Sequence, residues 1–172
     1  MTDNEIIKTG RNVVRIESEA VANLEGSINK EFVKAVDTIF TSKGRVVLTG
    51  MGKSGLVARK IVATLNSTGT AAIYLHPTDA LHGDLGMVRK EDVVIVISKS
   101  GLTDEISKLL PMFKRLGVKL IAMAGNLNSP LVRDSDIFLN ISVKEEACPH
   151  DLAPTSSTTA TLVMGDALSV AL

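Results

Sequence analysis

The chain has few aromatic residues, one cysteine and no excess of charge of either sign. The single Cys148 excludes an internal disulfide framework and favours a cytoplasmic protein. Nineteen basic residues balance nineteen acidic ones without forming blocks, which argues against a nucleic-acid-binding protein. No stretch reaches the ~18 uncharged apolar residues of a membrane span. The polar start, MTDNEIIKTG, does not match a secretory signal.

The core must therefore consist mainly of Val, Ile, Leu and Ala, because aromatics make up 3% of the residues and hydrophobic residues 45%. That composition is typical of a parallel sheet covered by helices. Amphipathic patterns predict two N-terminal helices, over residues 5–25 and 29–42. Five short β-branched runs follow and alternate with helical stretches: 45–50, 71–75, 92–98, 118–125 and 136–142.

Strand–helix–strand spacing of this kind predicts right-handed crossovers and a parallel sheet with helices on both faces. We expect one domain over residues 1–172, with N-terminal helices in 1–43 and an α/β core in 44–172. A final helix begins near Thr155. Its apolar pattern is still running at Leu172, which indicates that the natural chain continues further.

The glycine-rich turn GMGKSG, residues 50–55, allows three interpretations. A P-loop requires a glycine five positions before Gly52, where Val47 stands, and is excluded. A dinucleotide-binding turn requires an acidic residue at the end of the next strand, near 74–77, and none is there. The third interpretation is a sugar monophosphate held by hydroxyls and backbone N–H groups at helix N-termini.

Three hydroxyl-bearing segments at predicted helix starts fit the third interpretation. They contain Ser54; Ser98, Ser100 and Thr103; and Thr155, Ser156, Ser157 and Thr158. In an open α/β sheet such turns converge at the carboxyl ends of the strands, where ligands bind. Helix capping is the competing explanation for any one segment. Three such segments favour a phosphate site.

Several longer stretches carry a family resemblance: GMGKSG, STGT, HPTDALHGDLGMV, SKSG and KEEACPHDLAPTSSTTATLVMGDALSVAL. From about residue 5 to the end, the chain resembles the sugar isomerase (SIS) domain of arabinose-5-phosphate isomerases. The resemblance implies a five-stranded parallel sheet of flavodoxin-like winding, sandwiched by helices and assembled as a homo-tetramer. It also implies interconversion of D-ribulose 5-phosphate and D-arabinose 5-phosphate through a cis-enediol, for the synthesis of Kdo and lipopolysaccharide.

The resemblance assigns site residues as well. Those it makes catalytic are Lys53, Glu105, Glu146 and His82. Substrate and phosphate contacts fall on Gly52, Ser54, Gly69, Thr70, Ser98, Ser100, Gly101 and Thr103, and the hydroxyl pattern adds Ser156, Ser157 and Thr158. No cofactor is required, although His76 is a candidate zinc ligand. Lys99 and Leu102 depart from the family pattern SxSGE, and a further functional histidine and a pair of CBS domains lie outside these residues.

The chemistry needs a base above the C1–C2 pair and a group that stabilises the enediolate. We expect partial burial to raise the pKa of Glu146 so that it moves the carbon-bound proton. Glu105 then handles hydroxyl protons or opens the cyclic form, and Lys53 stabilises the developing charge. His82 either hydrogen-bonds sugar hydroxyls or acts as an acid–base partner. Two alternatives stay open: a non-catalytic phosphosugar sensor, and an isomerase of another sugar phosphate. The presence of both acids and the lysine favours an enzyme.

Overall fold

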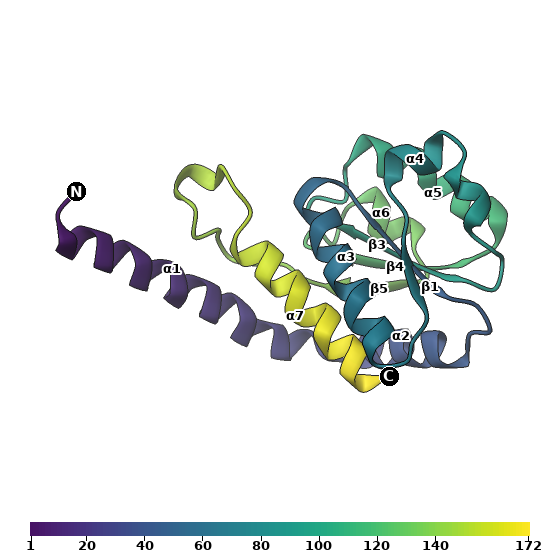
Figure 1. Ribbon diagram of the computed structural model, residues 1–172, viewed down its shortest axis with the longest axis horizontal. Helices are drawn as coiled ribbons and strands as arrows, with labels where there is room; N and C mark the ends of the chain where they lie inside the picture. Colours follow the sequence, from purple (N-terminus) through teal and green to yellow (C-terminus); the bar gives the residue numbers. More distant parts are fainter.

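One sheet of five parallel strands forms the centre of the molecule (Figure 1). The computed structural model describes residues 1–172. The strands are β1 (Val46–Gly50), β2 (Ala72–Tyr74), β3 (Val93–Ser98), β4 (Lys119–Ala124) and β5 (Ile137–Asn140). Their order, β2-β1-β3-β4-β5, confirms the predicted sheet and winding, and every neighbouring pair is parallel. The order reverses between β1 and β3, which makes their carboxyl ends the switch point where such sheets bind ligands.

Seven α-helices surround the sheet: α1 (Asp3–Asn23), α2 (Lys30–Thr41), α3 (Gly52–Ser67), α4 (Pro77–Leu81), α5 (Asp104–Leu116), α6 (Pro130–Asp134) and α7 (Ser156–Ala171). Single 3-10 turns lie at Leu24–Ser27, Asp84–Met87 and Pro149–Asp151. The two predicted N-terminal helices are confirmed. Helices α4 and α6 occupy stretches that the sequence predicted as a loop and a turn. Each has five residues and begins with proline, so neither is long enough to show a helical period.

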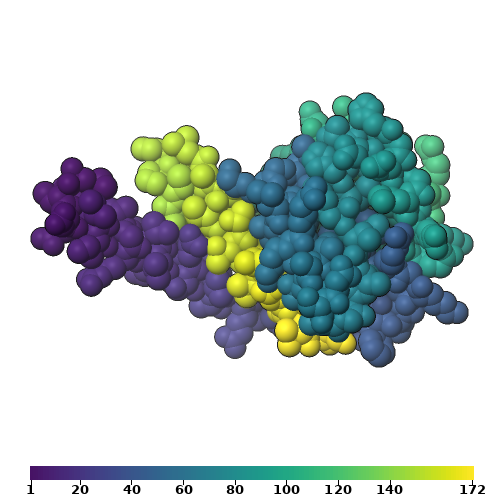
Figure 2. Space-filling model, viewed as in Figure 1, coloured from purple at the N-terminus to yellow at the C-terminus, as the bar shows by residue number.

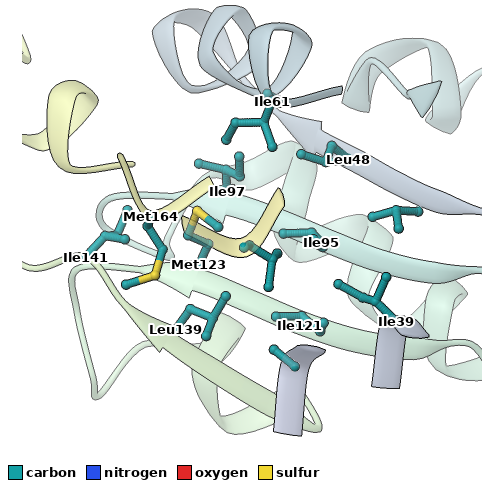
Figure 3. Close-up of a cluster of buried hydrophobic side chains, with 14 of the residues drawn as sticks. Ile39, Leu48, Ile61, Ile95, Ile97, Ile121, Met123, Leu139, Ile141 and Met164 are labelled. Carbon is teal, nitrogen blue, oxygen red and sulfur yellow. The ribbon is translucent and has the colours of Figure 1, made fainter. Parts of the chain in front are cut away.

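Alternating strand residues divide the core into two layers, one on each face of the sheet. Ile95 and Ile97 face α2, α3 and α7, whereas Val94 and Val96 face α4, α5 and α6. Figure 3 shows the first layer, in which Ile61 of α3 and Met164 of α7 meet the strand side chains. Burial on both faces explains why β1 and β3 are nearly continuous apolar runs rich in Val and Ile, whereas the edge strands β2 and β5 are partly exposed.

Helix α7 packs between α1 and α3, so the C-terminal helix joins the N-terminal one to the sheet (Figure 1). The first half of α1 is exposed and projects from the body, as the purple end in Figure 2 shows. A capping box at Thr2 and Glu5 starts this helix. None of the helices has the length and apolar character needed to cross a bilayer.

Candidate active site

A cavity of about 380 Å³ opens at the carboxyl edge of the sheet, between the first turns of α3 and α7. Its lining residues come from four places in the chain: Met51, Lys53, Ser54, Val57, Lys99, Glu146, Asp151, Pro154, Ser157, Thr158 and Thr161. The structure thus brings together two of the three predicted hydroxyl segments. Ser54 of the first lies opposite Ser157 and Thr158 of the third, with Lys53 beside them.

The turn between β1 and α3 depends on two glycines. Gly52 has φ +55°, which favours glycine, and it lets α3 begin directly after the strand. At Gly55 a Cβ would lie 2.5 Å from the Gly50 carbonyl oxygen and 2.6 Å from the Tyr74 hydroxyl. The first turn of α3 therefore packs closely against the end of β1. No side chain caps this helix, so its first N–H groups remain available to an anion.

The second hydroxyl segment, between β3 and α5, is bonded within itself. The Ser98 hydroxyl accepts a bond of 3.1 Å from the Gly101 N–H and lies 3.0 Å from the Thr103 hydroxyl. The Ser100 hydroxyl accepts a hydrogen bond of 3.2 Å from the N–H of Leu102. None of the three hydroxyl residues lines the cavity in this chain. Lys99, from the same loop, is the residue that does.

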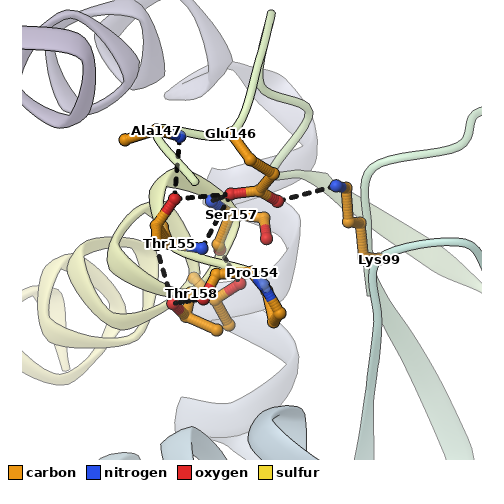
Figure 4. A network of polar contacts seen from close by, with 8 residues as sticks. Lys99, Glu146, Ala147, Pro154, Thr155, Ser157 and Thr158 are labelled. Carbon is orange, nitrogen blue, oxygen red and sulfur yellow. Dashed lines mark hydrogen bonds and ion pairs between the residues drawn. The ribbon is translucent and has the colours of Figure 1, made fainter. Parts of the chain in front are cut away.

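Glu146 lies at the centre of a polar network that joins three segments (Figure 4). Its Oε1 accepts a bond of 2.6 Å from the Lys99 ammonium. Its Oε2 accepts bonds from the Thr155 N–H at 2.8 Å, the Thr155 hydroxyl at 3.2 Å and the Ser157 N–H at 3.2 Å. The carboxylate thus satisfies two N–H groups at the start of α7, those of Thr155 and Ser157, where helix geometry also favours negative charge.

The expected rise in the pKa of Glu146 is wrong. Burial by itself would raise this pKa, but the hydrogen bonds from Lys99, Ser157 and Thr155 outweigh it and lower the pKa to about 2. Glu146 is consequently ionised throughout the neutral range. In this arrangement it has little tendency to accept a proton, because a good general base needs a pKa near the working pH.

Glu105 and His82 lie apart from the cavity. Glu105 is in the first turn of α5 and is partly exposed, and His82 is exposed at the end of α4. Neither lines the cavity with Lys53 in the single chain. Ser156 is also absent from the lining, since its side chain is fully buried and its hydroxyl has no hydrogen-bond partner.

Gly69 and Thr70, predicted as substrate contacts, lie at the opposite edge of the sheet, so they cannot make these contacts at this cavity within one chain. They follow α3, whose 16 residues run antiparallel to the strands for about 24 Å. The N–H of Thr70 bonds to Leu65 at the end of that helix, and the next residue pairs with the start of β1. A helix after a parallel strand always returns the chain to the amino edge.

The candidate zinc ligand His76 has one acidic neighbour. Its buried Nδ1 makes no hydrogen bond and lies 4.0 Å from the Asp79 carboxylate, and its ring meets Tyr74 edge-on at 6.3 Å. No group of three metal-ligating side chains exists in the chain. A structural zinc ion takes four protein ligands and a catalytic one takes three, so His76 and Asp79 within this single chain are too few to hold zinc by themselves.

Two charged cavity residues, Lys99 and Asp151, had no role in the sequence predictions. Lys99 lies within the SKSG stretch, but its partner Glu146 is 47 positions away, which no local pattern indicates. Asp151 follows His150, and both have positive φ, 52° and 60°. Consecutive non-glycine residues in this region are uncommon and mark functional or strained turns. The sequence carries no signal for that conformation.

The fold and cavity define a class of α/β protein with a doubly wound parallel sheet and a polar cavity at its switch point. The SIS domain family matches residues 39–171, and the chain belongs to this family. Among curated relatives, arabinose 5-phosphate isomerase KdsD of Pseudomonas aeruginosa is 52% identical over 168 residues, 98% of this chain and 52% of its own length. KdsD of Escherichia coli strain K12 is 53% identical over 165 residues, 96% of this chain and 50% of its own length.

A solved structure extends the comparison. E. coli CFT073 c3406 in complex with arabinose 5-phosphate superposes with a TM-score of 0.95 and is 42% identical, covering 99% of this chain and 91% of that one. The chain spans about half the length of the curated relatives it matches.

Proposed function

We propose that the chain belongs to an aldose–ketose isomerase that interconverts D-arabinose 5-phosphate and D-ribulose 5-phosphate. The observation that carries this proposal is the convergence of Lys53, Ser54, Ser157 and Thr158 on one cavity at the switch point of the sheet. The curated relatives named for this activity support it, as does the similar chain bound to arabinose 5-phosphate. A cavity of about 380 Å³ lies within the usual range for small ligands.

The reaction moves one proton between neighbouring carbons. A base removes the C2 proton of the open-chain aldose, the electron pair forms the C1–C2 double bond, and the former aldehyde oxygen takes the negative charge. Transfer of the hydroxyl proton from O2 to O1, together with return of a proton to C1, then gives the ketose. Lys53 stabilises the charged oxygen because its ammonium borders the cavity at the start of α3.

The phosphate binds where hydroxyls and helix starts meet. Ser54 and Thr158 supply hydroxyls, and the uncapped N-terminus of α3 supplies N–H groups. Gly52 and Gly101 permit the turns before α3 and α5, and Ser98, Ser100 and Thr103 shape the second turn. This proposal keeps Glu146 as the group that moves the C2 proton, with Glu105 and His82 acting on hydroxyl protons in the assembled enzyme.

The finer parts of the proposal concern the whole protein. We include a cytoplasmic homo-tetramer, a role in the synthesis of Kdo and lipopolysaccharide, and a sugar phosphate rather than a nucleic acid or membrane as partner. No cofactor takes part in the proton transfer, since Lys53 supplies the positive charge that a metal would otherwise provide.

Conversion of sugar phosphates tests the proposal. The chain, and a longer one extended past Leu172, are incubated with arabinose 5-phosphate, a six-carbon aldose phosphate and a seven-carbon one, and ketose formation is measured. We expect turnover of the pentose phosphate alone. Binding detected by ³¹P NMR without turnover in either chain would identify a sensor, and turnover of a larger sugar would identify a different isomerase.

A further inference from the structure

The Lys99–Glu146 ion pair closes one side of the cavity and joins the loop after β3 to the loop after β5. Its two partners differ sharply in burial. The Glu146 side chain is 1% exposed, whereas the Lys99 side chain is 52% exposed. The carboxylate is therefore the fixed member of the pair, and the lysine is the member with freedom to move.

The two oxygens of the Glu146 carboxylate have different partners. Oε2 is held by three donors at the start of α7, two from Thr155 and one from Ser157. Oε1 has a single donor, the ammonium of Lys99. Departure of Lys99 would free Oε1 beside the cavity while Oε2 kept the side chain in place.

An anion in the cavity would compete for that ammonium. Lys99 and Lys53 both line the cavity, with the hydroxyls of Ser54 and Thr158 between the first turns of α3 and α7. The acidic groups lining it are Glu146 and Asp151. A phosphate group presents three strong acceptor oxygens, whereas the carboxylate offers the ammonium only Oε1, and a lysine ammonium is a compact donor on a flexible stem that can exchange between them.

We propose that Lys99 is a positioning residue that holds the Oε1 of Glu146 in the free protein and transfers its ammonium to the phosphate of the bound substrate. The transfer leaves Oε1 free to accept the C2 proton of the sugar. This inference rests on the proposed isomerase function, and it resolves the difficulty that Glu146 is too weak a base in the free protein. Substrate binding itself would then make Glu146 more basic, since the carboxylate loses its only cationic partner.

The test follows the carboxyl group of Glu146 directly. Protein labelled with ¹³C at glutamate Cδ is titrated by NMR from about pH 7 to about pH 3.5, and the Glu146 signal is identified by its loss in Glu146→Gln. We expect no titration of this signal in the free wild type. Titration should appear in Lys99→Met, remain absent in Lys99→Arg, and remain absent in the control Lys114→Met. Lys114 pairs with Asp134 away from the cavity and has the same 52% exposure.

The exchange is tested by adding inorganic phosphate, and separately arabinose 5-phosphate, to the wild type. Either anion should make the Glu146 signal titrate in the same window. Two results overturn the inference: a Glu146 signal in Lys99→Met that behaves as in the wild type, or a wild-type signal that neither anion changes. Both NMR readouts are independent of turnover. A chain that converts no arabinose 5-phosphate would therefore refute the proposed isomerase function, but it would leave the role of Lys99 to be decided by the titrations.

Discussion

The Oε2 of Glu146 accepts a hydrogen bond of 2.8 Å from the backbone N–H of Thr155, and this contact fixes the loop after β5 to the first turn of α7. The same oxygen accepts a hydrogen bond from the N–H of Ser157. One buried carboxylate thus satisfies two N–H groups that the start of a helix leaves without a backbone partner. A side chain that the sequence indicates for catalysis is thus also a structural contact.

Replacing Glu146 by Gln should destabilise the protein by about 2–3 kcal/mol, because Lys99 loses its anionic partner and the α7 N–H groups lose a charged acceptor. Urea unfolding of the variant and the wild type at neutral pH measures the difference. An unchanged free energy of unfolding would mean that the network is not formed in solution.

The same carboxylate should make stability depend on pH. The pKa of Glu146 is lowered from 4.5 to about 2 on folding, so its ionised form is favoured in the native state. Its contribution, on the order of 3 kcal/mol, is complete above about pH 4.5 and is lost as the pH falls toward 2. Urea unfolding at a series of pH values should show wild type and Glu146→Gln converging in acid. Asp92 and Asp136 also have lowered pKa values, but both are present in the two proteins, so their contribution cancels from the difference. A constant difference would contradict the assignment.

Gly55→Ala should destabilise the protein by about 1–3 kcal/mol, since the new Cβ would lie 2.5 Å from the Gly50 carbonyl oxygen. Gly10→Ala is the matched control, because that glycine is helical and a Cβ added there would have nothing within 4 Å. We expect the control to be neutral or stabilising by up to about 1 kcal/mol. Thermal unfolding of both variants makes the comparison, and equal effects would refute close packing at Gly55.

Lys60→Met should change stability by less than about 1 kcal/mol, although Lys60 and Asp166 form an ion pair of 2.5 Å between α3 and α7. Both side chains are more than two-fifths exposed, so water and salt screen the pair. Unfolding at low and high salt checks this, and a loss as large as that of Glu146→Gln would be incompatible with an exposed pair.

The sheet was predictable because the central strands β1 and β3 are rich in Val and Ile and buried on both faces, and because glycine or hydroxyl residues stand where helices begin. Helices α4 and α6 could not be predicted, because five residues are too few to show the periodic apolar pattern of a helix. Ser54, Ser157 and Thr158 were found by one rule, that residues after parallel strands share an edge, whereas Lys53 was assigned from the family resemblance. Gly69 and Thr70 came from the resemblance, and the same rule, applied to the length of α3, places them at the other edge of the sheet.

The lowered pKa of Glu146 could not be predicted from the sequence, for a different reason. Its pKa depends on an ammonium 47 positions away and on two N–H groups whose direction is set by the backbone at the start of α7. Burial alone predicts that the pKa of Glu146 is raised, the opposite of the shift that the structure gives. Neither the distance to Lys99 nor those N–H directions follow from residue spacing.

The most direct measurement is deuterium uptake from D₂O at C2 of arabinose 5-phosphate, followed by ¹H NMR for the wild type, Lys53→Met and Lys60→Met. Both lysines are exposed on α3, but only Lys53 lines the cavity. We predict exchange by the wild type and Lys60→Met, and exchange at least about 100-fold slower in Lys53→Met. Equal rates in Lys53→Met and the wild type, or no exchange by the wild type and by the chain extended past Leu172, would contradict an isomerase site in this cavity.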